Sequence, residues 1–204
     1  MPDPARFAVA AEQIAAAGRW LYQRGWSPAT SSNYSLRLDA GSCAITSSGC
    51  DKERLAADQV MVVDLDGRPL GSGRPSAETL LHTRLYRRWP EVGAVLHTHS
   101  VGATVLSRLV GAGQTLVLEG YELAKAFPGI NDHCTPLRLP VLANSQDMTV
   151  LADAADAVLD ADIRAYLICG HGLYTWGPDL ATVRRQVEAL EFLFACELEL
   201  RRAR

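Results

Sequence analysis

Segments with helical and with strand-like periodicity alternate along this chain, and that alternation limits its fold more than any other feature. Apolar residues recur at helical spacing within residues 4–24, 76–89, 147–159 and 179–200. Short apolar or alternating runs, typical of strands, lie between them at residues 34–47, 60–65, 93–99 and 165–169. Helices and strands that interleave in this way cover a shared sheet, so we expect an α/β fold in one domain, residues 1–204.

Turn and capping residues indicate how these elements connect. Asp39-Ala40-Gly41 interrupts the alternation of residues 34–47 and predicts a hairpin, and Asp66-Gly67 predicts another turn. These hairpin signals favour a mixed or antiparallel sheet. We expect Ser76 and Ser100 to cap helices and Asp179 to open the long terminal helix.

The composition is ordinary for a globular protein, with 48% apolar and 21% charged residues. A net charge of −3 shows no basic excess, which argues against a nucleic-acid or anionic-membrane partner. No apolar run approaches the ~20 residues of a membrane helix, and the N-terminus does not read as a secretory signal, so we expect a cytoplasmic protein. The five cysteines contain no C-x-x-C spacing, so a disulfide scaffold is not expected.

Two histidines separated by one residue end a predicted buried strand. Side chains i and i+2 of a strand project to the same face, so His97 and His99 can share one metal ion. Catalytic zinc usually has three protein ligands and one open position. His171 is the best third ligand, because it follows an apolar strand and lies between glycines that allow close approach of a ligand. The three histidines therefore predict a zinc site.

The other candidate ligands have simpler interpretations. His82 lies beside an apolar residue in a predicted helix, which is typical of a packing or surface histidine, and His133 lies in a polar loop. Cys169 shares a face with His171 by strand alternation and is therefore an alternative fourth ligand. A buried reduced thiol is the more common role for such a cysteine.

Short segments with these histidines occur in the order typical of one known family. The segments are Ser31-Ser32-Asn33-Tyr34-Ser35, Thr46-Ser47-Ser48-Gly49, Pro75-Ser76-Ala77-Glu78, and His97-Thr98-His99 with the later Gly170-His171-Gly172. With them the chain resembles the class II aldolases over nearly its whole length. The resemblance implies a three-layer α/β/α domain with a mostly antiparallel central sheet and one zinc ion per subunit on the three histidines. It also implies a homotetramer whose active sites lie near subunit interfaces.

The resemblance places the phosphate group of a small sugar-phosphate substrate against Asn33, Ser48, Gly49 and Ser76. Small hydroxyl and amide residues offer hydrogen-bond donors without bulk, and a helix starting at Ser76 would add free backbone N–H groups. Each segment alone is typical of a turn, and only their occurrence with the histidines favours a binding role. Family members often have two serines before the glutamate, where this chain has a serine and an alanine, so Lys52 is a candidate for the missing contact.

Within the family, further segments resemble the dehydratases of methionine salvage, which convert 5-methylthioribulose 1-phosphate to a 2,3-diketone by loss of water. These segments are residues 48–52, 121–125, 144–148 and 171–177. This resemblance assigns the acid/base role to Glu122. Glu78 competes for that role, because it stands where the aldolases keep their catalytic glutamate. Glu119 is interpreted as a solvated surface residue.

Other functions would use some of the same residues. An aldolase or epimerase acting on another sugar phosphate would keep the zinc and phosphate groups, and would differ in whether Glu122 and residues 144–148 line the pocket. A non-catalytic fold relative would have lost its metal, but the three histidines and both glutamates are present. A zinc hydrolase is disfavoured because the chain contains no H-E-x-x-H motif.

Overall fold

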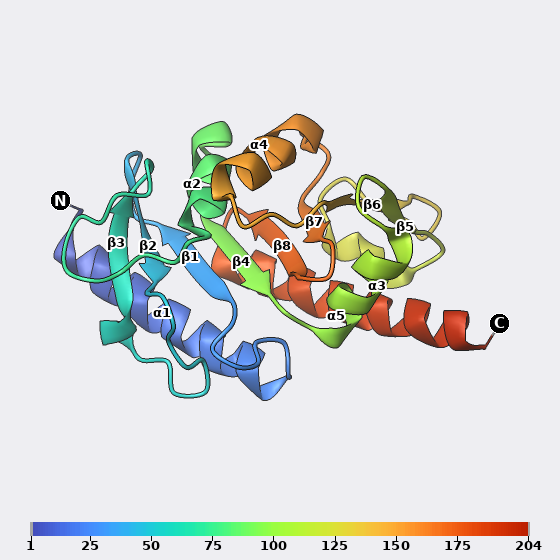
Figure 1. The fold of residues 1–204 in the computed structure, drawn as a ribbon, viewed down its shortest axis with the longest axis horizontal. Coiled ribbons are helices and arrows are strands. Elements are labelled where there is room, and N and C mark those ends of the chain that lie inside the picture. Colours follow the sequence, from blue (N-terminus) through green and yellow to red (C-terminus); the bar gives the residue numbers. More distant parts are fainter. Residues whose placement is uncertain (1, 204) are drawn as a thin grey trace.

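The computed structural model describes residues 2–203 and contains an eight-stranded sheet flanked by helices (Figure 1). The spatial order of the strands is β3-β2-β1-β4-β8-β7-β6-β5. Their bounds are β1 (Asn33–Arg37), β2 (Ser42–Thr46), β3 (Val60–Asp64), β4 (Ala94–Thr98), β5 (Thr115–Leu118), β6 (Leu137–Leu142), β7 (Ala165–Ile168) and β8 (Gly172–Gly177). The helices are α1 (Pro4–Gln23), α2 (Thr79–Arg88), α3 (Val101–Val110), α4 (Met148–Val158) and α5 (Leu180–Arg202), with 3₁₀ turns η1 (Ala57–Gln59) and η2 (Glu122–Ala126). Met1 and Arg204, the ends of the predicted domain, lie outside the described residues.

Neighbouring strands of this sheet are antiparallel except for β6 and β7, which are parallel. The predicted antiparallel character is therefore confirmed. The register places Asn33 of β1 opposite His97 of β4, and His97 opposite Tyr174 of β8. The start of β1, the end of β4 and the start of β8 consequently lie side by side at one end of the strands.

Helices cover both faces of the sheet, as Figure 1 shows. On one face, α2 and α4 pack over a core that includes Val95, Tyr166 and Trp176. On the other face, α1 and α5 cover the sheet, and α3 packs against α5. Apolar surface is thus buried on both sides, which gives the three-layer α/β/α arrangement expected from the sequence. Within residues 2–203, no helix is both long and apolar enough to cross a membrane.

Side-chain caps start two of the helices where the sequence predicts. The Ser100 hydroxyl accepts a hydrogen bond from the Ala103 N–H at 3.0 Å and begins α3 directly after β4. The Asp179 carboxylate accepts from the Thr182 N–H at 2.7 Å and begins α5. Such caps satisfy N–H groups that have no partner within the helix. His99 therefore lies between the end of β4 and the cap of α3.

Ser76 does not cap α2, so that prediction is wrong. The helix begins at Thr79, with Glu78 in the N-cap position. Residues 77–78 form a turn, in which the Ser76 carbonyl accepts from the Thr79 N–H at 3.1 Å and the Ser76 hydroxyl accepts from the Glu78 N–H at 3.3 Å. This additional turn delays the helix and sets Glu78, instead of Ser76, at its start.

Candidate metal centre and anion pocket

Three histidines from two distant segments meet at one end of the strands. His97 lies in β4, His99 follows it, and His171 lies in the turn between β7 and β8. Their ring centroids are 4.5 Å apart for residues 97 and 99, 5.0 Å for 97 and 171, and 4.7 Å for 99 and 171. Glu78 joins them, and one ligating atom from each residue lies within 4.8 Å of the others. Atoms at this spacing suit a single metal ion.

Hydrogen bonds direct the histidine rings toward a common centre. The His97 Nδ1–H donates to the Leu173 carbonyl at 2.9 Å, which leaves Nε2 as the ligating atom. That Nε2 is buried and forms no hydrogen bond within the described residues. His171 Nδ1 lies 3.4 Å from the Asn144 Oδ1, so its Nε2 also faces the cluster. A buried nitrogen with an unused lone pair is what a metal ligand requires.

Burial keeps two of these histidines neutral at physiological pH. It lowers the pKa of His97 to about 4. Burial, together with repulsion from the neighbouring histidines, lowers the pKa of His99 to about 3. Neutral imidazole is the form that binds zinc and related divalent ions. Three imidazoles and one carboxylate therefore form a donor set that fits a divalent metal ion.

Glu78 is an ionised carboxylate with three close neighbours. Its Oε1 lies 3.0 Å from the His171 Nε2, and its Oε2 lies 3.4 Å from the His97 Nε2. Oε2 also accepts a hydrogen bond from the Asn33 Nδ2 at 2.6 Å. Burial alone would raise the pKa of Glu78, whereas positive charge at the histidine cluster, of the kind a bound divalent ion would supply, and the hydrogen bond from Asn33 lower it. From the sequence, Glu78 is the alternative acid/base group. The sequence does not predict that this side chain lies beside the histidine rings.

A polar cavity of about 320 Å³ opens next to the cluster. Its walls come from the loop before β1, the loop after β2 and the turn before α2, and its lining residues are Thr30, Ser31, Ser32, Asn33, Ser47, Ser48, Gly49, Ser76, Glu78 and His99. The Ser48 N–H donates to the Arg74 carbonyl at 2.9 Å and holds two of these segments together. Among the predicted phosphate-binding residues, all but Lys52 line this cavity. Hydroxyl and amide groups without bulky side chains suit an anion such as a phosphate group.

The loop before β1 supplies two hydroxyl groups that were not among the predicted binding residues. Ala29, Thr30 and Ser32 have positive φ angles of 52°, 60° and 73°. Non-glycine residues rarely adopt this region, and such strain concentrates at functional sites. The Ser31 and Ser32 hydroxyls are buried beside the cavity, with no hydrogen-bond partner among the described residues. The sequence shows two adjacent serines before Asn33. It does not reveal the strained backbone that places their hydroxyls beside the cavity.

Lys52 does not line the cavity, but it holds together two of the loops that do. Its buried ammonium group donates to the carbonyls of Cys50 at 2.8 Å and Thr30 at 3.3 Å, so it connects two loops that carry cavity residues. Burial lowers the pKa of Lys52. A direct contact between Lys52 and a phosphate group stays a prediction.

Glu122 lies outside the cluster in the described chain. It begins η2 at the surface, where its side chain is 67% exposed and pairs with Lys125 and, at 3.6 Å, with His133. A hydrogen bond from Lys125 is the main cause that lowers the pKa of Glu122. Its acid/base role stays a prediction. Cys169 is also outside the group of clustered ligands and is a free thiol.

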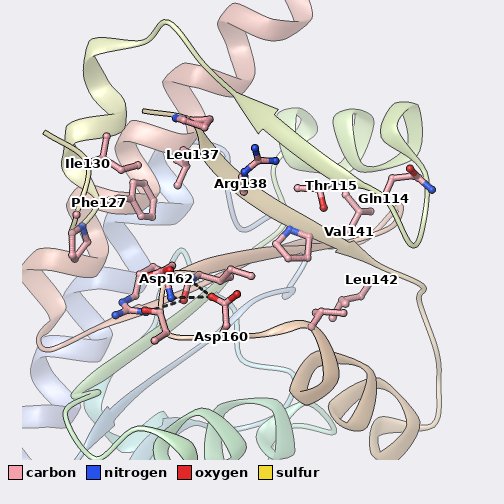
Figure 2. A pocket seen from close by; sticks show the side chains of 18 of the residues that line it. Gln114, Thr115, Phe127, Ile130, Leu137, Arg138, Val141, Leu142, Asp160 and Asp162 are labelled. Carbon is pink, nitrogen blue, oxygen red and sulfur yellow. Dashed lines mark hydrogen bonds between the residues drawn. The ribbon is translucent and has the colours of Figure 1, made fainter. Parts of the chain in front are cut away.

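A larger and mainly apolar cavity of about 920 Å³ lies at the other end of β7 (Figure 2). β6 and β7 pair only over residues 141–142 and 167–168, so the two strands diverge beyond them. Phe127, Leu137 and Ile163 line the space that this leaves. None of the clustered histidines, nor Glu78, is among the residues that line it. Apolar walls do not suit a charged sugar, so the polar cavity is the candidate site.

Known proteins resemble this chain in sequence and in fold. The chain matches the class II aldolase and adducin N-terminal domain family over residues 12–198. It is 58% identical to methylthioribulose-1-phosphate dehydratase from Marinobacter nauticus, with 100% of both chains covered. It is 56% identical to the protein of that name from Stenotrophomonas maltophilia, over 98% of this chain and 95% of the relative.

Solved structures share the arrangement of layers. L-fuculose-1-phosphate aldolase from Thermus thermophilus has a TM-score of 0.76 and 27% identity, with 97% of this chain and 96% of that chain covered. YgbL from Klebsiella pneumoniae has a TM-score of 0.82 and 25% identity, with 95% and 90% covered. The family match also spans the strands and turns that hold the histidines and the polar cavity. This chain therefore belongs to the class II aldolase and adducin N-terminal domain family.

Proposed function

We propose that this protein is a zinc-dependent hydro-lyase that converts 5-methylthioribulose 1-phosphate to 2,3-diketo-5-methylthiopentyl 1-phosphate, a step of methionine salvage in the cytoplasm. The observation that carries the proposal is the meeting of His97, His99, His171 and Glu78 beside a cavity of small polar residues. Relatives with 54–58% identity that bear the name methylthioribulose-1-phosphate dehydratase support this choice of substrate.

The reaction removes the proton on C3 and the hydroxyl group on C4 of a 2-ketose phosphate. The electron pair of the C3–H bond forms the C3–C4 double bond, and the C4 hydroxyl leaves as water once it is protonated. The enol that remains tautomerises to the diketone. A zinc ion held by the three histidines would supply Lewis-acid stabilisation of the charge that develops on the C2 and C3 oxygens. We infer zinc because neutral imidazoles suit it, whereas calcium and magnesium prefer oxygen ligands.

The polar cavity would hold the phosphate group of the substrate. The predicted residues on its walls offer hydroxyl and amide donors at the positions described above. The hydroxyls of Ser31 and Ser32 can turn toward phosphate oxygens without breaking any hydrogen bond in the described chain. The buried charge of Lys52, behind the same loops, would favour an anion there.

We assign proton transfer to Glu122 and the positioning of ligands to Glu78. A general acid or base works best when its pKa lies near the operating pH, and the neighbours of Glu78 hold its pKa far below that range. Glu122 is 67% exposed in one chain, so burial has little effect on it there. We propose that in a homotetramer Glu122 enters the cavity of a neighbouring subunit, where desolvation raises its pKa.

Aldol cleavage of a sugar phosphate is the second candidate function. One observation favours it, because Glu78 stands at the position of the aldolases' catalytic glutamate and lies against His97 and His171. The product decides between the two candidates. Zinc-loaded protein should convert 5-methylthioribulose 1-phosphate to a diketone phosphate that is lighter by one water, and should leave L-fuculose 1-phosphate intact. Cleavage of L-fuculose 1-phosphate without any dehydration would reverse the assignment.

A further inference from the structure

A line of buried hydrogen bonds runs from α2 to the polar cavity through His82. The His82 ring is fully buried. Its Nδ1 lies 2.7 Å from the Ser35 Oγ, which in turn lies 2.8 Å from the Tyr86 Oη. On the other side of the ring, Nε2 contacts the Asn33 Oδ1. The Asn33 Nδ2 then donates to the Glu78 Oε2 at 2.6 Å.

The carboxylate at the end of this line dictates the direction of each hydrogen bond. Glu78 can only accept, so Asn33 must turn its NH₂ group toward Glu78 and its oxygen toward His82. That oxygen can only accept, so the His82 Nε2 must carry the proton. Nδ1 is then the acceptor for the Ser35 hydroxyl, which takes its own hydrogen bond from Tyr86.

The surroundings keep the His82 ring and the Tyr86 hydroxyl in these states. Burial lowers the pKa of His82 to about 3, so the ring is neutral, and the Tyr174 ring packs against it at a centroid distance of 5.6 Å. Burial also raises the pKa of Tyr86 well above its ordinary value, so its hydroxyl stays a donor. His82 is not among the residues that line the cavity. The packing histidine expected from the sequence thus has a defined partner on each ring nitrogen.

We propose that His82 is a positioning residue, which holds the Asn33 amide with its N–H groups directed at the cavity. One N–H reaches Glu78, and Nδ2 also lies 3.3 Å from the Ser76 Oγ, on the wall where the phosphate group of a substrate would bind. The reversed amide would place its oxygen against the Glu78 carboxylate and, as long as Ser35 donates to Nδ1, its NH₂ group against the His82 N–H, and both contacts are unfavourable in a buried site. The inference rests on the proposed function only for the identity of the phosphate ester.

Two amide replacements of His82 separate this role from simple packing. Glutamine places its NH₂ group near the position of the imidazole Nε2 and can donate to Asn33, whereas asparagine reaches only the Nδ1 position beside Ser35. We expect H82N to lose about 10- to 100-fold in kcat/KM, mainly through a raised KM, with its metal content unchanged. H82Q should recover to within about threefold of wild type. Equal losses in the two variants, or no loss in either, would overturn the proposal.

A double-mutant cycle tests whether His82 acts through Asn33. N33A alone should weaken substrate binding, and in that background H82N should cost less than about twofold more, because the amide that His82 orients is gone. Losses that simply add would mean that His82 acts by another route, and the positioning role would be rejected.

Two measurements are independent of turnover. Nitrogen NMR of wild-type protein labelled with ¹⁵N-histidine should show His82 as the Nε2–H tautomer, and the Nδ1–H tautomer would contradict the proposal. Titration with inorganic phosphate should show weaker binding by H82N than by H82Q or wild type, and equal affinities would contradict it. If wild type leaves 5-methylthioribulose 1-phosphate unchanged while both results hold, the proposed function fails and the role of His82 stands.

Discussion

Two glutamates are candidates for proton transfer, and their environments in the fold are opposite. The Glu78 side chain is 14% exposed, lies against two of the clustered histidines and accepts a hydrogen bond from Asn33. The Glu122 side chain is 67% exposed on the short turn η2, where it pairs with Lys125 and lies near His133. One carboxylate is therefore oriented before a ligand arrives, whereas solvent-screened pairs hold the other only weakly.

This difference indicates which parts of the site a single chain can form alone. The candidate metal centre depends on strand register, since Asn33 lies opposite His97 and the turn before β8 adds His171. Glu122, the proposed acid/base group, lies on a surface segment that another subunit would have to cover. A single chain should therefore bind metal and phosphate but catalyse poorly, and the predictions below test that division.

Removal of a metal ligand should have the largest effect. His97→Ala deletes a fully buried imidazole whose second nitrogen is held by the Leu173 carbonyl. We expect loss of bound metal and a fall in turnover of at least about a thousandfold. Elemental analysis and steady-state rates check this, with the exposed His133→Ala as a control that should keep its metal. A His97→Ala protein with one equivalent of metal would mean that the cluster is not the metal site.

Loss of the proposed acid/base group should abolish most turnover without disturbing the fold. Glu122→Gln should lower kcat by about 10²–10⁴-fold, because the amide can neither take nor give the proton. Metal content and unfolding temperature should not change, since the side chain is largely exposed. The matched control is Glu119→Gln, three residues earlier and also exposed, which should keep the wild-type rate. A Glu122→Gln rate near that of wild type would transfer the acid/base role to Glu78.

Mixed oligomers test whether Glu122 acts across a subunit interface. Subunits with His97→Ala and subunits with Glu122→Gln should each be inactive alone. After random reassembly in equal amounts, roughly a quarter of the sites would combine an intact His97 with an intact Glu122 from the neighbour, and activity should return in that proportion. Mixtures of His97→Ala with His99→Ala should stay inactive, because both changes damage the same cluster. No recovery in the first mixture would place Glu122 in the cavity of its own chain.

A change at Glu78 should act through the metal and have a smaller effect. Glu78→Gln removes the negative charge that faces His97 and His171 but keeps the shape of the side chain. We expect metal affinity to fall by about 10- to 100-fold, and added zinc to restore much of the rate. The rate of Glu122→Gln should not respond to added zinc. A Glu78→Gln rate that stays low at saturating zinc would favour Glu78 as the proton carrier.

The features that could be predicted from the sequence depend on local spacing. Alternation along one strand brings His97 and His99 to the same side, and the caps at Ser100 and Asp179 involve residues only three positions away. The order of the strands depends on contacts between distant segments. For that reason the prediction of the three-layer α/β/α arrangement rests on the family resemblance in addition to the alternation of elements.

The features that could not be predicted depend on long-range register, backbone strain or a second chain. Glu78 reaches the histidines because the turn at residues 77–78 delays α2, and no spacing in the sequence encodes that turn. The role proposed for His82 depends on its contacts with Ser35 and Asn33 of β1, which form only because α2 packs on this face of the sheet. The surroundings of Glu122 in an oligomer depend on residues of another subunit.

A third glutamate, Glu191, extends the comparison of Glu78 with Glu122, because burial is the main cause of its shifted pKa. Glu191 on α5 is buried, and its Oε1 has no hydrogen-bond partner among the described residues. Burial raises the pKa of Glu191 to about 8, opposed only by a hydrogen bond with Ser100. Burial acts in the same direction on Glu78. The neighbours of each carboxyl group, more than its depth, therefore decide which one is ionised at neutral pH.

This contrast predicts how stability depends on pH. A carboxyl group whose folded-state pKa is raised stabilises the fold fully below its unfolded value of 4.5, and that stabilisation is lost as the pH rises toward about 8. Between pH 6 and pH 8, wild type should lose about 2 kcal/mol of unfolding free energy from this group, whereas Glu191→Gln cannot ionise and should not. Denaturant unfolding at both pH values measures the difference, with the exposed Glu12→Gln as a control that should follow wild type. Equal pH slopes for Glu191→Gln and wild type would show that Glu191 is ionised in the folded protein, and the different neighbours of Glu191 and Glu78 would then not set their ionisation apart.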